Sequence, residues 1–145
     1  INDGASAVLI AEAAFAKAQG WEILATIEDY CTSGVEPARV MSAPIPAVKT
    51  LLARNGLNVL DVDVYEHNEA FASASCAVAK ELGIPEDRFN LHGGAVSLGH
   101  PLGASGTRCL ITMLGAMRRL NLNSGIVTLC LGGGNAVAMY VRRPE

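Results

Sequence analysis

Apolar and polar positions along the chain form blocks that predict strands and helices in alternation. Helical spacing is clearest over residues 105–120, where Leu110, Met113 and Met117 share one face. Three further helices, each followed closely by a glycine, are predicted over residues 11–19, 44–55 and 70–82. Runs of β-forming residues predict strands over residues 5–10, 21–30, 63–66, 89–91, 124–131 and 135–141, with a loop over 31–43.

This order of elements predicts an α/β fold. Strands that alternate with helices favour a layered mixed β-sheet with helices on its faces. The last two strands are separated only by three glycines, so we expect them to pair antiparallel.

The composition agrees with a folded domain and excludes several classes of protein. Of the 145 residues 50% are hydrophobic and 17% are charged, which favours one well-buried core. The formal net charge of −3 includes both signs without a basic stripe, so we expect no nucleic-acid partner. No apolar run approaches the roughly 20 residues of a membrane span, and the first residues show no signal-peptide pattern. We therefore expect no membrane partner.

Four cysteines, at positions 31, 76, 109 and 130, bear on the compartment. Their number and spacing do not form a disulfide framework, and no Cys-x-x-Cys pair suggests zinc. We therefore expect free thiols, a cytoplasmic location and no metal site. Cys31, Cys76 and Cys109 are expected to pack as small hydrophobic side chains.

The glycine stretch, residues 91–106, holds five glycines, one proline and two histidines. Pro101 fixes the chain directly after His100 and keeps that histidine out of helical geometry. His100 is therefore presented from a stiff turn, which suits an imidazole that transfers a proton. The alternative is a glycine-rich turn with an incidental histidine.

Two other segments carry a resemblance together with this stretch. Residues 67–72 read His-Asn-Glu-Ala-Phe-Ala, and residues 130–134 read Cys-Leu-Gly-Gly-Gly. With the Gly-His-Pro and Gly-Ala-Ser-Gly of the glycine stretch, they resemble the three motifs of the C-terminal half of thiolases, in family order. Thiolases make or cleave β-ketoacyl-CoA.

The resemblance implies a division of the chain and a set of partners. Residues 1–19 would be the tail of the N-terminal thiolase half, and residues 20–145 the C-terminal domain. The substrates would be acyl-CoA and CoA, with no other cofactor, and the intact enzyme would be a homodimer or homotetramer. The acyl-accepting cysteine of the family lies in the N-terminal half, so this chain alone is expected to be inactive.

The resemblance also implies roles for single residues. His100 matches the histidine that activates the nucleophilic cysteine and helps to form one oxyanion hole, and Asn68 matches the asparagine that holds a water there. Cys130 matches the second cysteine, which donates and accepts protons, and the N–H of Gly132 would serve the other oxyanion hole. Two apolar positions are implied in substrate binding, Phe71 and Met41.

Several of these residues have structural alternatives. Asn68 could cap the helix that follows. Glu69 could act as a general base, but a glutamate in a first turn more often supports the helix dipole. Cys130 could be an inert core thiol, and Phe71 part of the core or of a pocket wall. His67 and His92 are expected to be exposed or to make structural hydrogen bonds.

Two other classes of function remain as alternatives for the whole chain. The three glycines at residues 132–134 could indicate a nucleotide-binding module. They match neither Gly-x-Gly-x-x-Gly before a helix nor a phosphate loop ending in Lys-Ser/Thr. A strand, not a helix, is predicted after them. The other alternative is a non-catalytic unit of folding or dimerisation, because an unpaired first strand exposes apolar surface.

Overall fold

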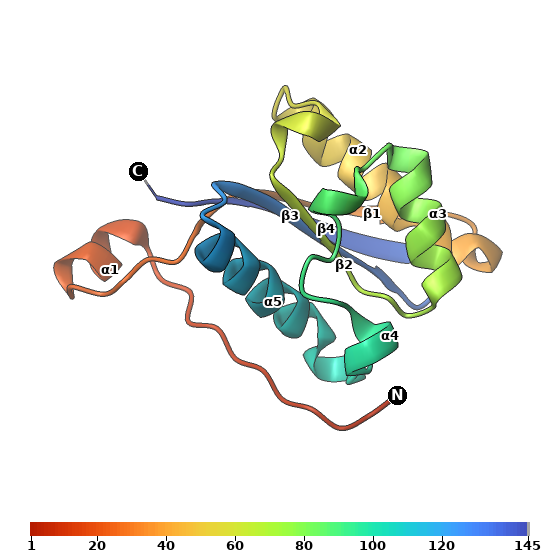
Figure 1. The fold of residues 1–145 in the computed structure, drawn as a ribbon, viewed down its shortest axis with the longest axis horizontal. Helices are drawn as coiled ribbons and strands as arrows, with labels where there is room; N and C mark the ends of the chain where they lie inside the picture. Colours follow the sequence, from red (N-terminus) through yellow and green to blue (C-terminus); the bar gives the residue numbers. More distant parts are fainter. Residues whose placement is uncertain (145) are drawn as a thin grey trace.

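The computed structural model describes residues 1–144, which form a mixed four-stranded sheet with helices on both faces (Figure 1). The strands are β1 (Thr26–Gly34), β2 (Val64–His67), β3 (Ser124–Leu131) and β4 (Asn135–Arg142), in the spatial order β1-β4-β3-β2. β2 runs parallel to β3, whereas β4 pairs antiparallel with both β3 and β1. The predicted mixed sheet and its antiparallel last pair are confirmed.

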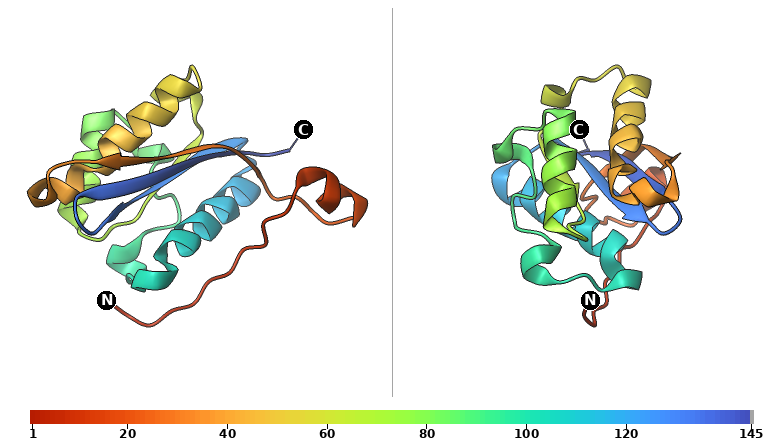
Figure 2. Two further views of the ribbon diagram at one scale, coloured as in Figure 1. Left: turned by 180° about the vertical axis from the view of Figure 1, so that it is seen from behind. Right: turned by 90° about the vertical axis from the view of Figure 1, so that its right-hand side faces the viewer.

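The helices form two layers around this sheet. α2 (Pro44–Arg54) and α3 (Ala72–Leu82) lie on one face, and α5 (Ser105–Leu120) lies on the other (Figures 1 and 2). The short helix α4 (Ala95–Leu98) lies near the first turn of α5. The molecule is thus a three-layer α/β/α arrangement, as the alternation of elements predicted.

β3 is buried on both faces, and this divides the core in two. Ile126 packs into the cluster under α2 and α3, whereas its neighbour Val127 packs into the cluster under α5. Successive side chains of a strand point to opposite faces, so adjacent residues belong to different layers. The first five residues of β3 are buried for this reason, and they include the polar residues Ser124 and Thr128.

Local sequence signals set the ends of the long helices. α2 begins with Pro44, whose missing N–H costs nothing in a first turn. α3 ends at Gly83 with φ of 69°, and α5 ends at Asn121 with φ of 56°, both in the left-handed region. The helices predicted over residues 44–55, 70–82 and 105–120 are confirmed within two residues at each end.

The prediction for β1 was wrong at both ends. The strand begins at Thr26 rather than at residue 21 and continues to Gly34, through residues that were predicted as loop. β4 pairs with it along this whole length, from Thr26 opposite Arg142 to Gly34 opposite Asn135. The partner strand therefore sets the boundaries. Part of the remaining predicted loop is a 3₁₀ helix, Pro37–Ser42.

Two other predicted strands are not formed. Residues 5–10 adopt no regular structure and have no strand beside them among residues 1–144. Residues 89–91 make only a single bridge, between Phe89 and Tyr65. Both segments have β-forming composition, but a strand also requires a neighbour that offers backbone hydrogen bonds.

The N-terminal arm, residues 1–12, runs alongside α5 and leads into α1 (Ala13–Ala18) (Figures 1 and 2). Its first residues lie against the glycine stretch. A Cβ on Gly4 would lie 2.8 Å from Pro101 Cβ, and the hydroxyl of Ser6 donates to the Ala104 carbonyl over 2.8 Å. α1 forms within the helix predicted over residues 11–19.

Residues 132–134 form the turn between β3 and β4. Gly133 and Gly134 have φ of 80° and 90°, where residues with a Cβ are strained. A Cβ on Gly134 would also lie 2.3 Å from the carbonyl oxygen of Val35. β4 follows directly, so this turn has no helix N-terminus to bind a phosphate. The turn therefore lacks the features of a nucleotide-binding module.

Candidate functional site

The predicted site residues gather where the two parallel strands end. β2 leads into Asn68, whose backbone N–H donates to the Thr128 carbonyl over 3.1 Å. Cys130 lies two residues beyond Thr128 on the neighbouring strand β3. Ligands of α/β proteins commonly bind at the carboxyl ends of parallel strands. The motifs at residues 67–72 and 130–134 therefore meet at an edge that suits a site.

His100 lies on a turn that joins α4 to α5. Its Nδ1 lies 2.5 Å from the hydroxyl oxygen of Ser105, the first residue of α5. The preceding residue, Gly99, has φ of 89°, and a Cβ there would meet the side chain of Asn2. Burial lowers the pKa of His100 from its ordinary value, and the positive charges of the N-terminal amino group and of Arg108 add to this effect. The imidazole is therefore a neutral base at neutral pH.

Asn68 is fully buried between His100 and α5. Its Nδ2 lies 3.3 Å from His100 Nε2, and its Oδ1 accepts a hydrogen bond of 2.9 Å from Arg108 Nη2. The alternative that Asn68 caps the next helix is wrong, because α3 begins after Phe71 and has no side-chain cap. The amide is engaged instead by groups from distant parts of the chain.

Cys130 lies near the end of β3 with its thiol partly covered. Its Sγ is 4.0 Å from the sulfur of Met41, so the structure brings together two of the predicted site residues. Burial raises the pKa of Cys130, and a backbone hydrogen bond opposes this in part. The thiol thus holds its proton at neutral pH and can donate it. Gly132, two residues on, is exposed and has open space around its α-carbon.

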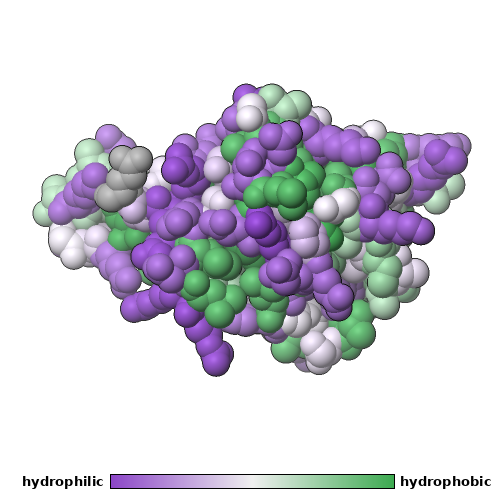
Figure 3. Space-filling view, turned by 45° about the horizontal axis from the view of Figure 1, so that its top comes forward, coloured by the Kyte–Doolittle hydropathy of each residue, from purple (hydrophilic) through white to green (hydrophobic). Residues whose placement is uncertain are grey.

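Phe71 is exposed by 61%, so the alternative that it belongs to the core is wrong. It ends the link between β2 and α3 and serves as the N-cap residue of α3. Three other exposed apolar side chains lie in the glycine stretch: Val96, Leu98 and Leu102. Apolar surface therefore accompanies the two motifs that carry Asn68 and His100. On the face seen in Figure 3, apolar side chains form separate patches among polar ones.

The other two histidines differ in their surroundings. His67 is buried, with Nδ1 2.7 Å from Ser75 Oγ and its ring stacked on Phe89 at 6.1 Å. Burial lowers the pKa of His67 to about 4, so the ring stays neutral. His92 is exposed. The expectations of a structural hydrogen bond or of exposure are confirmed for these two.

The Glu69 carboxylate forms hydrogen bonds at the glycine stretch rather than at the helix that follows it in sequence. It accepts from Asn90 Nδ2 over 2.9 Å and from the backbone N–H of Val96 over 3.0 Å. Val96 lies in the first turn of α4, and α3 has no acidic residue in its own first turn, so the prediction that Glu69 supports the dipole of the next helix is wrong. A Cβ on Gly94 would lie 2.3 Å from this carboxylate carbon. A glycine is therefore required where the two segments meet.

Sequence reasoning missed two charged residues beside Asn68. Arg108 Nη1 lies 3.6 Å from Glu66 Oε1, and the side chains of Arg108 and Glu66 are 16% and 1% exposed. Burial raises the pKa of Glu66 to about 8, and the charge of Arg108 opposes this rise. A carboxylate inside the buried strand β2 was the available signal, because such a group is rarely buried without a partner.

Cys76 is also placed differently from the prediction. It lies on the exposed side of α3, whereas Cys31 and Cys109 are buried as expected. All four thiols are free, and within residues 1–144 no group of three acidic, histidine or cysteine side chains could hold a metal. In the same part of the chain no helix has the length and apolar character to cross a membrane.

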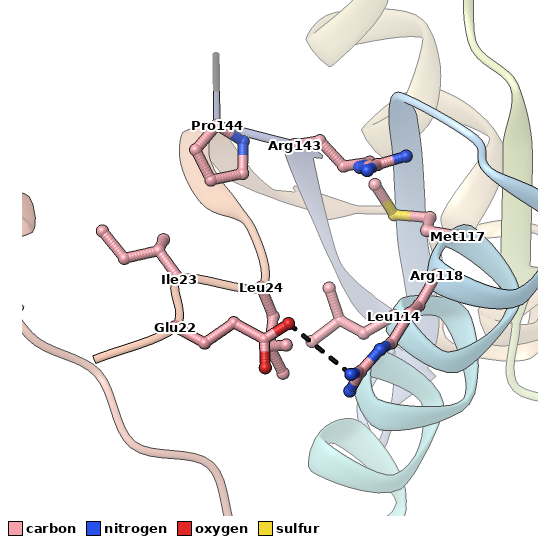
Figure 4. Close-up of a pocket in the computed structure, with 8 residues that line it drawn as sticks. All are labelled: Glu22, Ile23, Leu24, Leu114, Met117, Arg118, Arg143 and Pro144. Atoms are coloured by element: carbon pink, nitrogen blue, oxygen red, sulfur yellow. Dashed lines mark ion pairs between the residues drawn. The ribbon is translucent and has the colours of Figure 1, made fainter. Parts of the chain in front are cut away.

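A separate hollow lies toward the C-terminal end of α5 (Figure 4). It has a volume of about 180 Å³ and lies between residues 22–24 and the helix, where Glu22 and Arg118 approach to 3.7 Å. None of the predicted site residues lines it. His100 lies at the opposite end of α5, so this hollow is not part of the candidate site.

Comparison with known proteins agrees with the three motifs. The family model described as thiolase, C-terminal domain, matches residues 21–143. The chain belongs to the thiolase family. It is 46% identical over 143 residues to the cytosolic acetyl-CoA acetyltransferase of Rattus norvegicus and to the acetyl-CoA acetyltransferase of Escherichia coli K12. It is 47% identical over 143 residues to that of Pseudomonas aeruginosa.

These thiolase relatives are longer than the chain. Each alignment covers 99% of this chain but only 36% of the relative. The chain thus spans about a third of the length of the curated relatives it matches, and the matched part is their C-terminal region. The boundary predicted between residues 19 and 20 stays a prediction.

Proposed function

We propose that the chain is the C-terminal part of an acyltransferase that moves acyl groups between CoA thioesters. The curated relatives are named acetyl-CoA acetyltransferases, and acetyl-CoA and CoA are the substrates we infer. The direction is either thiolysis of a β-ketoacyl-CoA or Claisen condensation. The observation that carries the proposal is the contact of 3.3 Å between His100 Nε2 and Asn68 Nδ2, at the edge of the sheet where β3 brings Cys130.

In this proposal His100 acts as the base for the acyl-accepting thiol, which the longer relatives would supply from their N-terminal part. Once protonated, His100 and the amide of Asn68 present two N–H donors to one place. Such a pair can hold a water or the developing oxyanion of a thioester. The donors come from a turn and a strand end that are fixed by other contacts, so little reorganisation is needed.

Cys130 supplies the second proton in this scheme. Its raised pKa keeps the thiol protonated, which suits a donor to the substrate α-carbon or to the departing CoA sulfur. The N–H of Gly132, an exposed residue, would stabilise the second oxyanion. Met41, in contact with Cys130, and the exposed Phe71 would bind the acyl or pantetheine part of the substrate. No cofactor other than the substrate CoA is proposed.

The test is a chimera in which this chain replaces the matched segment of the E. coli relative. The chimera should catalyse CoA-dependent cleavage of acetoacetyl-CoA, whereas the chain alone should be inactive. His100→Ala and Cys130→Ala should each lower kcat by about 10²–10⁴, the usual effect of losing one acid–base group. Asn68→Ala should cost less, because the amide acts through a bound water.

Matched controls separate chemistry from folding. His92→Ala removes an exposed histidine of the same stretch, and Cys76→Ala removes an exposed thiol. Both should leave kcat within about twofold of the parent chimera, since surface substitutions cost little. Near-normal turnover of the His100→Ala chimera would refute the central assignment.

The alternative of a non-catalytic folding or dimerisation unit rests on exposed apolar side chains in the first 30 residues. Leu9, Ile10 and Tyr30 are each about 70% exposed or more. We propose that the intact enzyme covers such surface and forms a homodimer or homotetramer in the cytoplasm. A chimera that assembles normally but stays inactive would favour the non-catalytic reading.

A further inference from the structure

The orientation of the Asn68 amide is fixed mainly by Arg108, and the Cys109 thiol adds a longer contact of 3.8 Å to the same amide oxygen. The guanidinium has only N–H donors, so the atom of Asn68 that lies 2.9 Å from Arg108 Nη2 must be the amide oxygen. The amide nitrogen therefore points the other way, to His100 Nε2 at 3.3 Å. An amide in the reverse orientation would place two donors against each other.

The orientation of the amide then decides which nitrogen of His100 carries the proton. Because Asn68 Nδ2 donates, His100 Nε2 must accept through its lone pair and therefore carries no proton. On the other side of the ring, the Ser105 hydroxyl donates to the Pro101 carbonyl over 3.1 Å. It can therefore accept from His100 Nδ1–H, over 2.5 Å. The hydrogen bonds therefore run in one direction. They begin at the Arg108 guanidinium, which only donates, and end at the Pro101 carbonyl, which only accepts.

We propose that Arg108, held beside Glu66, is a positioning residue that keeps His100 in the tautomer with the proton on Nδ1 and the lone pair on Nε2. This inference rests on the proposed function for its purpose, because the Nε2 lone pair is the base that takes the thiol proton. In that step the S–H bond breaks and an Nε2–H bond forms, and no other reactant is required. Nε2–H then becomes a second donor beside the Asn68 amide.

The surroundings of Arg108 favour this role over simple packing. Its Nε and Nη1 are buried and have no hydrogen-bond partner within residues 1–144. Glu66 Oε1, which lies beside Nη1, also has no hydrogen-bond partner in this part of the chain. Burying a pair of this kind costs free energy of folding. Replacing such a pair with apolar side chains of similar volume often leaves the protein as stable or makes it more stable. The hydrogen bond in which Arg108 is satisfied is the one to Asn68. The function of this arginine therefore lies in the amide it orients.

The test reads the tautomer itself by ¹⁵N NMR of the imidazole in the 145-residue chain, at a pH where histidine is neutral. His100 should show a pyrrole-type Nδ1 and a pyridine-type Nε2. Arg108→Met should shift the tautomer ratio by about fivefold toward Nε2–H, the factor that corresponds to one net hydrogen bond. Arg118→Met, at an exposed arginine of the same helix, is the matched control and should change nothing.

Two further variants keep the proposal falsifiable if Arg108→Met unfolds the chain. Arg108→Met combined with Glu66→Gln leaves no unpaired buried charge and should give the same shift. Asn68→Asp replaces the donor to His100 with an acceptor and should move the proton to Nε2. A parent chain with its proton on Nε2, or an unchanged ratio in folded Arg108 variants, would overturn the proposal. Neither result depends on turnover, so a failure here is distinct from an inactive chimera.

Discussion

Replacing Gly134 by alanine should destabilise the chain by about 2–5 kcal/mol. Its φ of 90° costs a residue with a Cβ about 1–2 kcal/mol. The new Cβ would also lie 2.3 Å from the Val35 carbonyl oxygen and 3.2 Å from backbone atoms of Pro37. These are main-chain atoms that cannot rotate away, and forced overpacking adds about 1–3 kcal/mol. The sum is a large part of the stability of a domain this size.

Two other glycines separate these contributions. Gly56 has φ of 65° but open space around it, so Gly56→Ala should cost only the backbone part, about 1–2 kcal/mol. Gly115 lies exposed inside α5, where alanine should stabilise by about 0.5–1 kcal/mol. Urea unfolding followed by circular dichroism gives all three free energies. If Gly134→Ala and Gly56→Ala differed by less than about 0.5 kcal/mol, the close approach to Val35 would be wrong.

Two further predictions concern titratable groups. Burial lowers the pKa of His67 from 6.5 to about 4, so the unfolded chain binds this proton more readily than the folded chain. The folded state therefore loses about 3 kcal/mol of stability as the pH falls from 6.5 to about 4. His67→Asn should lack this loss in urea titrations at several pH values, and equal pH dependence of the two proteins would contradict it. Brief iodoacetamide treatment should alkylate Cys76 first, because it is exposed, and spare Cys109, whose pKa burial raises to about 12. Peptide mapping gives the order, and faster labelling of Cys109 would refute this placement.

Elements with strong local signals could be predicted from the sequence. α5 has apolar positions at helical spacing, and its end combines basic residues with Asn121 in the left-handed region. The β3–β4 hairpin follows from two apolar runs joined by glycines. Strand boundaries depend instead on a partner that is distant in sequence. β1 extends to Gly34 because β4 lies beside it, and residues 5–10 lack such a neighbour in the described part of the chain.

The site shows the same division between local and tertiary causes. The turn that presents His100 follows from Gly99 and Pro101, and the structure confirms it. The partners of Asn68 could not be predicted, because a local pattern for an N-cap competes with hydrogen bonds from residues about 30 to 40 positions away. Cys76 was predicted to be in the core because its neighbours are small and apolar. The buried residues of α3 are instead Ala74, Ser75, Val78 and Leu82, and Cys76 is exposed.

The contacts of the N-terminal arm have a consequence for motion. Asn2 lies over Gly99, and Ser6 is bonded to Ala104, so the arm spans the turn of His100 from one side to the other. A rearrangement of that turn must displace the arm, and release of the arm leaves the turn open on that side. Segments joined in this way open as one cooperative unit. Opening of the turn around the imidazole therefore involves residues almost a hundred positions earlier in the chain.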